Sequence, residues 1–377
     1  MAKPAGRGGG VSRPSPWTAW MARALQLASL GAGHTSPNPL VGAVVLDADG
    51  QLVGEGFHAR AGGPHAEVGA LAQAGERARG GTLIVTLEPC CHQGRTPPCS
   101  EAVIAAGIAR VVLAMADPHH LVRGGGIARL RAAGLEVIEG VGEAEARRLN
   151  RAFLHRVATG RPLGILKWAM SLDGRTALPN GASQWISGPA ARGWVHRLRA
   201  RCDAVIVGGG TVRADDPLLT SRGQRDPEPL RVVLSRSLDL PEKARLWDTT
   251  SARTLVGHTN DLSAEQMQLL KGLADRGVMG CPLTVCEPWA LMEELAGLGC
   301  NQVLWECGPE LAAAALKQDC IQSVSAVIAP KLLGGRPART PLGNLEHSSL
   351  DDLPRWHLNE VATLGPDLVC WARPEGS

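Results

Sequence analysis

The chain has 377 residues, a length that favours two domains, and its 44% hydrophobic and 20% charged residues are typical of a folded globular protein. No apolar run approaches the roughly 18 residues that a membrane-spanning helix needs, so a membrane protein is not expected. The formal charge of +3 comes from Lys3, Arg7 and Arg13, and the rest of the chain is neutral. This balance argues against a nucleic-acid partner and favours a small-molecule substrate.

The first 16 residues, rich in Gly, Pro and Arg, predict a disordered tail. The tail has no apolar segment of the kind a secretory signal needs, so a cytoplasmic protein is expected. Residues 17–158 alternate between predicted helices and strands, which predicts a three-layer α/β/α domain. The predicted helices cover 17–30, 65–78, 100–106, 127–133 and 143–151, and the predicted strands cover 42–47, 82–87, 110–115 and 135–138.

A linker is predicted at 159–162, and a second α/β domain follows over residues 159–377. Its predicted strands cover 164–169, 203–207, 231–234, 254–257, 302–305, 324–329, 358–363 and 368–371. Its predicted helices cover 189–201, 262–275, 289–298 and 309–317. The two halves show no internal repeat, so two different α/β domains are expected.

Three short segments of the first half carry the chemistry of a zinc-dependent base deaminase: Pro64-His65-Ala66-Glu67, Glu88-Pro89-Cys90 and Pro98-Cys99. One imidazole and two thiolates hold a zinc ion and leave its fourth position for water. A carboxylate that does not bind the metal must carry the proton of that water, and Glu67 is the candidate. Cys91 and His92 are rival ligands, with Cys91 expected to be a neighbour only.

The eight residues between Cys90 and Cys99 are more than the two usual in such sites, and this spacing points to one family. The run Glu88-Pro-Cys-Cys-His-Gln-Gly-Arg-Thr-Pro-Pro-Cys99, together with Thr35-Ser-Pro-Asn-Pro-Leu-Val-Gly42, resembles the bifunctional deaminase–reductase of riboflavin biosynthesis. The resemblance runs from Trp17 to about Trp371. It implies a cytidine-deaminase-like first domain in which Asn38 holds the pyrimidine ring of the substrate. It also implies a second domain similar to dihydrofolate reductase, which uses NADPH.

Glycines follow two predicted strands of the second half, at Gly208–Gly210 and at Gly308, but neither forms a Gly-x-Gly-x-x-Gly fingerprint. On the glycines alone, tight turns after strands are the simpler reading. The resemblance rests instead on Lys167-Trp-Ala-Met-Ser-Leu-Asp-Gly174 and Gly210-Thr-Val-Arg-Ala-Asp-Asp-Pro217. It implies NADPH contacts from Ala169, Trp185, Ser187, Thr211, Asp215, Ser235 and Gly308. It implies substrate contacts from Ser183, Arg199, Leu219, Arg222 and Glu306.

The family reaction implied is removal of the 2-amino group of 2,5-diamino-6-ribosylamino-4(3H)-pyrimidinone 5′-phosphate, followed by reduction of the ribosyl group to ribityl. Arginine suits the substrate phosphate because a guanidinium binds phosphate with two hydrogen bonds. A homo-oligomer is expected. Two alternatives stay open: a nucleic-acid deaminase with an RNA-binding second half, and a second half that has lost its activity, since Ser187 and Cys307 depart from the usual family residues.

Several other residues are assigned no role in the reaction. Lys167 and Asp173 suit either an ion pair or an acid, and both are left outside the predicted site. Arg231 and Arg245 are expected at the solvated surface. His119 and His120 are expected in a loop, and the cysteines outside the zinc motif are expected to be reduced thiols.

Overall fold

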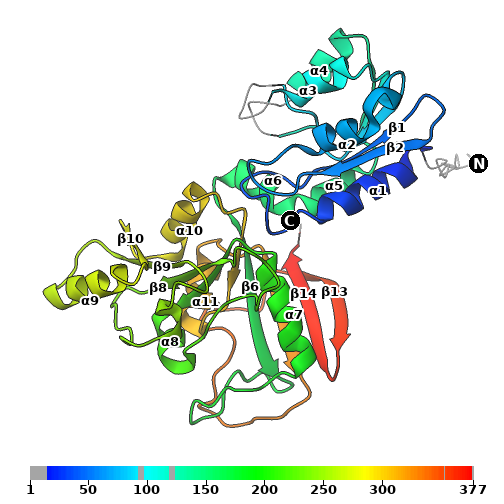
Figure 1. The fold of residues 1–377 in the computed structure, drawn as a ribbon. Coiled ribbons are helices and arrows are strands. Elements are labelled where there is room, and N and C mark those ends of the chain that lie inside the picture. The colour runs from blue at the N-terminus through cyan, green and yellow to red at the C-terminus, as the bar shows by residue number, and fades with distance from the viewer. Residues whose placement is uncertain (1–14, 92–96, 119–123, 352, 376–377) are drawn as a thin grey trace, which may run out of the picture. The chain divides into compact units, whose positions relative to one another are not determined.

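The computed structural model describes residues 15–91, 97–118, 124–351 and 353–375. The chain divides into two compact units, Met1–Asn150 and Arg151–Ser377, which we call the N-terminal and C-terminal units (Figure 1). Most of the predicted disordered tail, residues 1–14, lies outside the described residues. Among the helices of the described residues, none is long and apolar enough to cross a membrane.

The N-terminal unit is built on a five-stranded sheet with the order β2-β1-β3-β4-β5. The strands are β1 (Gly42–Leu46), β2 (Leu52–Phe57), β3 (Thr82–Val85), β4 (Arg110–Leu113) and β5 (Glu136–Ile138). Strand β1 pairs antiparallel with β2 and β3, whereas β3, β4 and β5 are parallel. Four of the five strands were predicted from the alternation of strands and helices in the sequence, and β2 was not.

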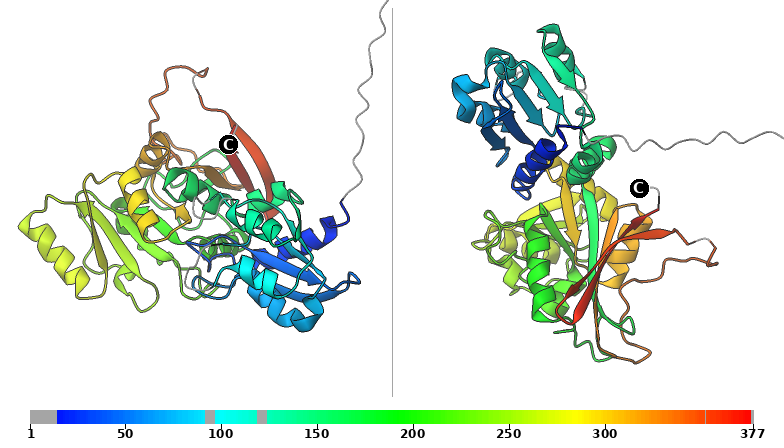
Figure 2. Two further views of the ribbon diagram at one scale, coloured as in Figure 1. Left: turned by 90° about the horizontal axis from the view of Figure 1, so that it is seen from above. Right: turned by 90° about the vertical axis from the view of Figure 1, so that its right-hand side faces the viewer.

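Helices cover both faces of this sheet (Figure 2). They are α1 (Thr18–Ser29), α2 (Ala66–Ala74), the 3-10 turn η1 (Gly75–Ala78), α3 (Cys99–Ala105), α4 (Gly125–Ala132) and α5 (Glu143–Leu149). One core joins Val45 of β1 to Ala70, Val103 and Leu130 of α2, α3 and α4. Helix α1 packs on β1, β2 and β3 and against α5. The three-layer α/β/α arrangement predicted from the sequence is confirmed.

Strand β2 was not predicted, because its Gly54 and Gly56 are weak strand formers. Both glycines are needed where β2 crosses α2. A Cβ on Gly54 would lie 2.1 Å from the Ala70 carbonyl oxygen, and one on Gly56 would lie 2.4 Å from the Ala66 carbonyl oxygen. This close approach fixes the start of α2 against the sheet.

The division between the units falls earlier than the sequence indicated, at residues 150/151 instead of 158/159. The predicted helix 143–151 is α5, and a further helix that was not predicted, α6 (Arg151–Thr159), packs on β6 (Leu163–Ser171) of the C-terminal unit. The Arg151 guanidinium also donates to the Gln322 carbonyl oxygen over 2.8 Å. Residues 159–162 therefore connect two elements of one unit rather than two domains.

The C-terminal unit contains a nine-stranded sheet with the order β10-β9-β8-β7-β11-β6-β12-β14-β13. Besides β6, the strands are β7 (Ala204–Gly208), β8 (Leu230–Leu234), β9 (Thr254–Thr259), β10 (Met279–Leu283), β11 (Gln302–Trp305), β12 (Ser323–Ala329), β13 (Trp356–Leu364) and β14 (Asp367–Pro374). The strands from β10 to β12 are parallel, and β14 and β13 complete the sheet in antiparallel pairing.

Two helical layers enclose this sheet. Its helices are α7 (Pro189–Ala200), α8 (Gly209–Asp215), the 3-10 turn η2 (Arg245–Trp247), α9 (Ala264–Ala274), α10 (Pro288–Gly297) and α11 (Pro309–Lys317). One core contains Leu198, Val212 and Leu273 from α7, α8 and α9, and the other contains Leu291 and Ala312 from α10 and α11. Of the ten tryptophans in the chain, Trp17 and Trp20 belong to the N-terminal unit and the other eight follow residue 150.

Arg231 is buried, so the expectation that it lies at the solvated surface is wrong. Its Nη2 atom donates to the carbonyl oxygens of Asp248 and Ala252, both over 2.7 Å, and its side chain is fully enclosed. These carbonyls belong to the turn before β9, and their hydrogen bonds offset part of the cost of removing the guanidinium from water, whereas Arg231 Nε is buried without a hydrogen-bond partner among the described residues. Arg245 is exposed, as expected.

Candidate active sites

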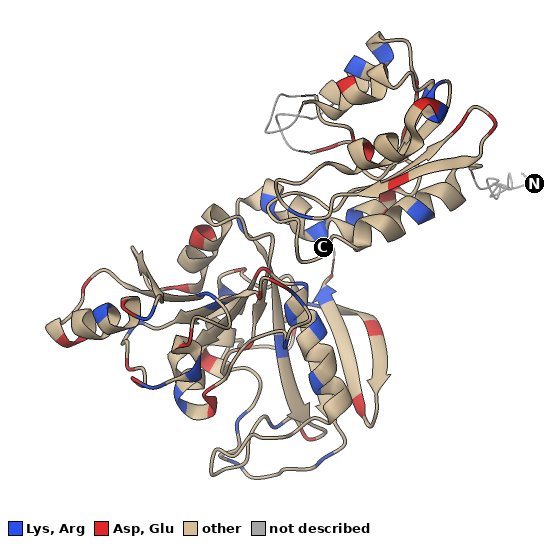
Figure 3. Cartoon of the chain, in the orientation of Figure 1, with Lys and Arg blue, Asp and Glu red and all other residues tan. Residues whose placement is uncertain are grey.

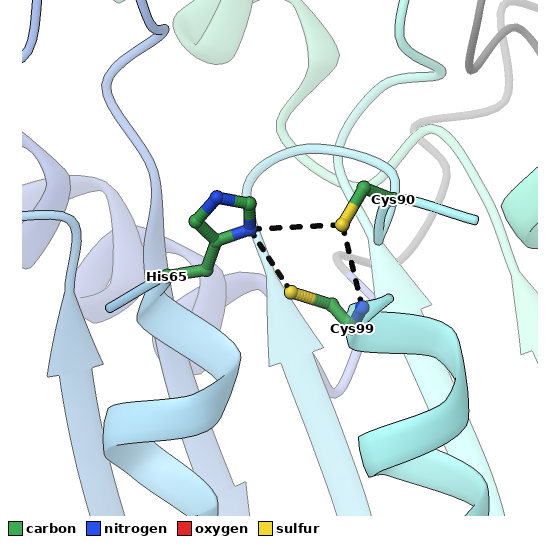
Figure 4. Close-up of side chains that lie close together, drawn as sticks. All are labelled: His65, Cys90 and Cys99. Carbon is green, nitrogen blue, oxygen red and sulfur yellow. Dashed lines mark hydrogen bonds between the residues drawn. The ribbon is translucent and has the colours of Figure 1, made fainter. Parts of the chain in front are cut away.

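Three side chains of the N-terminal unit converge at the positions predicted for a metal site (Figure 4). The Nδ1 atom of His65 lies 3.1 Å from Cys99 Sγ and 3.6 Å from Cys90 Sγ, and all three ligand atoms lie within 4.8 Å of one another. In the described part of the chain, this is the group of His, Cys, Asp and Glu side chains that could hold a metal ion. One imidazole nitrogen and two sulfurs are a donor set that fits zinc.

Each ligand is held at the end of a regular element. His65 is the extended residue that precedes α2, and Cys99 is the first residue of α3. Cys90 follows β3 by five residues, in the segment that leads toward α3. Because the two helices begin side by side on one face of the sheet, short motifs in the sequence were enough to predict the convergence.

The two cysteines interact closely, and their pKa values shift in opposite directions. The Cys99 thiol donates a hydrogen bond that lowers the pKa of Cys90 to about 4, and His65 contributes in the same direction. The Cys99 backbone N–H also donates to Cys90 Sγ over 3.3 Å. The hydrogen bond with Cys90, together with burial, raises the pKa of Cys99. The hydrogen bond with Cys90 also raises the pKa of His65.

Glu67 lies two residues after His65, in the first turn of α2, with a side chain that is 3% exposed. Burial raises the pKa of its carboxyl group to about 7. A hydrogen bond links this carboxyl group to Cys99, so Glu67 borders the metal-ligand group without being part of it. A carboxyl group with a pKa near neutrality can both accept and return a proton.

Asn38 is connected to the ligand group through His58, a residue that the sequence did not single out. His58 Nδ1 lies 3.0 Å from the carbonyl oxygen of Pro64, and its Nε2 lies 3.0 Å from Asn38 Nδ2. Burial lowers the pKa of His58, so the ring is neutral. Its Nδ1–H donates to Pro64, and its Nε2 accepts from the Asn38 amide. With this tautomer, the Asn38 amide nitrogen, and not its oxygen, faces His58.

Glu88 is a second residue near the metal site to which no role was assigned. Its buried carboxylate accepts four backbone hydrogen bonds of 2.9–3.1 Å, from Asp117, Gly124, Gly126 and Ile127. These bonds tie the segment before Cys90 to the start of α4. The rival ligand Cys91 is outside the metal-ligand group. His92, His119 and His120 lie outside the described residues.

In the C-terminal unit, the predicted residues gather where the parallel strands end. Ala169 lies near the end of β6, Ser235 follows β8, and Glu306 and Gly308 follow β11. Thr211 and Asp215 lie on α8, which begins directly after β7. Ligands of open parallel sheets bind outside the carboxyl ends of the strands, so this edge is the candidate site.

A buried ion cluster occupies this edge. The Arg199 guanidinium of α7 binds the Glu306 carboxylate through two hydrogen bonds of 2.5 and 3.0 Å, and Lys167 Nζ lies 3.5 Å from Glu306. The side chains are 10–14% exposed. Burial lowers the pKa of Lys167, although Glu306 acts against this. Lys167 therefore belongs to the ion cluster. The sequence alone had left open whether it forms an ion pair.

The cluster lies in a basic environment. Helix α7 carries Arg192, Arg197 and Arg199 and no acidic residue (Figure 3). Burial and the nearby Arg199 and Arg222 lower the pKa of His196, which is on the same helix. An anionic substrate group would be stabilised at this position.

Other predicted residues form separate contacts. Ser183 Oγ lies 3.0 Å from Asp215 Oδ1, which joins the loop after β6 to α8. Trp185 is 62% exposed, with the Arg192 guanidinium 4.7 Å from its ring centroid. The Ser187 carbonyl oxygen accepts from Arg192. Ala169 and Ser187 are partly buried, and Leu219 is buried.

One glycine of this edge allows a close approach to the backbone. A Cβ on Gly209 would lie 3.0 Å from Ser235 Oγ, whereas one on Gly308 would make an ordinary contact, 3.9 Å from Thr211 Oγ1. Gly308 precedes α11, with Pro309 at its first position and no side chain capping the helix. Uncapped amides at a helix start suit the phosphates of a dinucleotide, so these residues fit NADPH.

Known proteins match both units. Residues 162–370 match a family model described as the RibD C-terminal domain, and residues 15–115 match one described as the cytidine and deoxycytidylate deaminase zinc-binding region. The riboflavin biosynthesis protein RibD of Synechocystis is 50% identical over 347 residues, covering 92% of this chain and 93% of that protein. This chain belongs to the RibD family.

Further members of the RibD family agree in sequence and fold. RibD of Escherichia coli is 43% identical over 367 residues, covering 93% of this chain and 97% of that protein. The structure of Acinetobacter baumannii RibD, form 1, superposes with a TM-score of 0.85 at 41% identity, covering 95% of this chain and 98% of that chain. A Thermotoga maritima deaminase/reductase gives a TM-score of 0.83 at 34% identity, covering 95% and 98%.

As a RibD, the chain is a bifunctional enzyme of riboflavin biosynthesis. The N-terminal unit is its zinc-binding deaminase and the C-terminal unit is its NADPH-dependent reductase. The two-domain fold class predicted from the sequence is confirmed.

Proposed function

We propose that the deaminase unit removes the 2-amino group of 2,5-diamino-6-ribosylamino-4(3H)-pyrimidinone 5′-phosphate. The observation that carries this proposal is the convergence of His65, Cys90 and Cys99 beside the buried Glu67 carboxyl group. The Thermotoga maritima relative supports the substrate class, because its name specifies a diaminohydroxyphosphoribosylaminopyrimidine deaminase.

His65 Nδ1, Cys90 Sγ and Cys99 Sγ are the proposed zinc ligands. A zinc ion held by these ligands would supply an activated water for attack on the ring carbon. Glu67 would take a proton from that water and return it to the departing amine, because its buried carboxyl group lies beside the ligands without being one of them. Asn38 orients the pyrimidine ring, and His58 holds the Asn38 amide in one orientation.

The reductase unit then converts the ribosyl group of the deaminated product to ribityl, using hydride that NADPH carries. We assign the substrate to Ser183, Arg199, Leu219, Arg222 and Glu306, with Arg222 at the phosphate. We assign NADPH to Ala169, Trp185, Ser187, Thr211, Asp215, Ser235 and Gly308. Hydride attack on C1 of the ribosyl group breaks the bond between C1 and the ring oxygen, and Lys167, whose buried amine lies beside Glu306, is the proposed donor of the proton that this oxygen takes up.

Mass spectrometry of the products tests both assignments. Purified zinc-loaded protein is given the diaminopyrimidinone ribosyl phosphate with and without NADPH. We expect the deaminated ribosyl compound without NADPH and the ribityl compound with it. Deamination without reduction would contradict the reductase assignment, and no turnover at all would contradict the substrate assignment.

We also infer a homo-oligomeric, cytoplasmic enzyme. The edge strand β13 exposes Leu358 and Val361, by 58% and 55%, and an exposed apolar edge strand favours association with another chain. All ten cysteines are free thiols, which suits a reducing compartment. Light scattering after size-exclusion chromatography measures the mass, and a monomer at micromolar concentration would contradict the oligomer.

A further inference from the structure

The segment between α8 and β8 holds three non-glycine residues in the left-handed backbone region: Asp216 at the end of α8, and Leu219 and Arg222 in the loop that follows. Leu219 has a φ angle of 56° and Arg222 has a φ angle of 60°. Such a conformation costs free energy for residues with a Cβ, so it persists only where surrounding contacts hold the backbone. The residues that hold this loop therefore determine how Arg222 is presented.

Two charged side chains hold the backbone of this loop. Arg199 Nη1 donates to the Thr220 carbonyl oxygen over 3.0 Å. The Glu228 carboxylate accepts from the Ser221 N–H over 2.5 Å through one oxygen and from the Gly223 N–H over 2.9 Å through the other. Glu228 thus binds the backbone on both sides of Arg222.

The side chains of this loop differ in their exposure to solvent. Thr220 and Ser221 are buried, whereas the side chain of Arg222 is exposed. Successive N–H groups around a left-handed residue form a concave site for anions, and here the protein's own carboxylate fills it. The guanidinium of Arg222 is then the group of this loop that remains able to reach an anionic ligand.

The direction in which Arg222 projects is also constrained. Arg222 is close enough to His196 of α7 to lower its pKa, as is Arg199, which binds Glu306. Glu228 in turn interacts electrostatically with Arg199. The charge of Arg222 therefore acts on His196, which lies on the same helix as Arg199 of the ion cluster.

We propose that Glu228 is a positioning residue that fixes the backbone on both sides of Arg222 and thereby directs its guanidinium at the phosphate of the reductase substrate. This inference rests on the proposed role of Arg222 in binding that phosphate. Glu228 itself touches neither substrate nor cofactor.

The test is a comparison of Glu228→Gln with the wild type on two reductase substrates, 5-amino-6-ribosylaminouracil 5′-phosphate and its dephosphorylated form. A glutamine offers one oxygen in place of two, so one of the two backbone hydrogen bonds is lost. We expect the KM for the phosphorylated substrate to rise about tenfold, the value of one hydrogen bond to a charged group, with kcat unchanged. The KM for the dephosphorylated substrate, the NADPH dissociation constant and deamination should stay at wild-type values.

Matched variants separate the possible causes. Glu293→Gln, at an exposed site on α10, controls for loss of one negative charge in the same unit. Arg222→Gln and the double variant R222Q/E228Q test whether Glu228 acts through Arg222, and we expect the double variant to match R222Q. If E228Q does not fold, Glu228→Asp, which keeps the charge but has a shorter reach, is measured in the same way.

Four results would overturn the proposal. Equal rises in KM for both substrates would show general loosening of the unit, and a lower KM would show that the carboxylate competes with the phosphate. An unchanged KM in E228Q, with a raised KM in R222Q, would show that Arg222 is positioned without Glu228. If R222Q itself binds the phosphorylated substrate as the wild type does, the assignment of Arg222 under the proposed function is wrong, and the inference falls with it.

Discussion

Replacement of Glu306 by Gln should destabilise the reductase unit by about 3 kcal/mol at neutral pH. Burial alone would raise the pKa of Glu306, but Arg199 and Lys167 outweigh burial and lower it to about 2, from an ordinary value of 4.5. That difference corresponds to about 3 kcal/mol at roughly 1.4 kcal/mol per pH unit. Breaking a buried ion pair costs about 3–5 kcal/mol, which agrees.

The sign of the pH dependence follows from the lower pKa in the folded state. The contribution of the carboxylate is fully present above its unfolded pKa and is lost as the pH falls from about 5 toward 2. The stability difference between the wild type and E306Q should therefore be largest at neutral pH and shrink in acid.

Scanning calorimetry of the full chain measures this effect. For a unit of this size, about 3 kcal/mol lowers Tm by roughly 6–12 °C. The transition of the reductase unit should shift by that amount, whereas that of the deaminase unit should not, and Glu293→Gln serves as the control. A Tm of E306Q equal to that of the wild type at pH 7, or a deficit that is the same in acid as at neutral pH, would refute the reasoning.

Three further predictions concern the deaminase unit. Glu67→Gln should retain zinc, as measured by metal analysis, and lose about 10²–10⁴-fold in deamination rate because proton transfer is removed. Cys90→Ser should lose both zinc and deamination activity, whereas its NADPH-dependent reduction of the deaminated compound should continue. An unchanged zinc content would contradict the assignment of Cys90 as a ligand. His58→Ala should raise the KM for the diamino substrate by about two- to tenfold, the value of one hydrogen bond, because the Asn38 amide loses its hydrogen bond to His58. Zinc content should not change, and an unaffected KM would contradict the role of His58.

The metal site could be predicted from the sequence because its determinants are local. His65 and Cys99 each begin a helix, and Cys90 follows a buried strand, so short motifs with a recognisable order identify all three ligands. His58 could not be predicted as a site residue, because its role depends on its contacts with Pro64 and Asn38, and these contacts have no signature in the sequence.

The reductase site could not be assembled in this way. Its residues come from the ends of several parallel strands, which are distant in sequence and meet only in the folded sheet. The family resemblance identified the residues expected to bind NADPH and substrate. It did not predict the contact of Lys167 with Glu306 or the hydrogen bonds of Glu228. Helix α8 was missed because Gly209 and Gly210 at its start are poor helix formers.

Arg231 illustrates the limit of reasoning from residue type. Charged residues are usually exposed, but the turn before β9 presents two carbonyl oxygens at the position where the Arg231 guanidinium ends. The partner of a buried charge is defined by the tertiary fold, so composition and periodicity cannot reveal it.

The uneven distribution of tryptophan has a spectroscopic consequence. Two tryptophans precede residue 150 and eight follow it, and the chain contains no tyrosine. Ultraviolet emission therefore comes from indole alone and mostly from the reductase unit. The reduced nicotinamide ring absorbs at the wavelengths where indole emits, so energy transfer to NADPH should quench this emission when the cofactor binds. The native enzyme thus contains an optical reporter of reductase occupancy that needs no label and is little affected by the state of the deaminase.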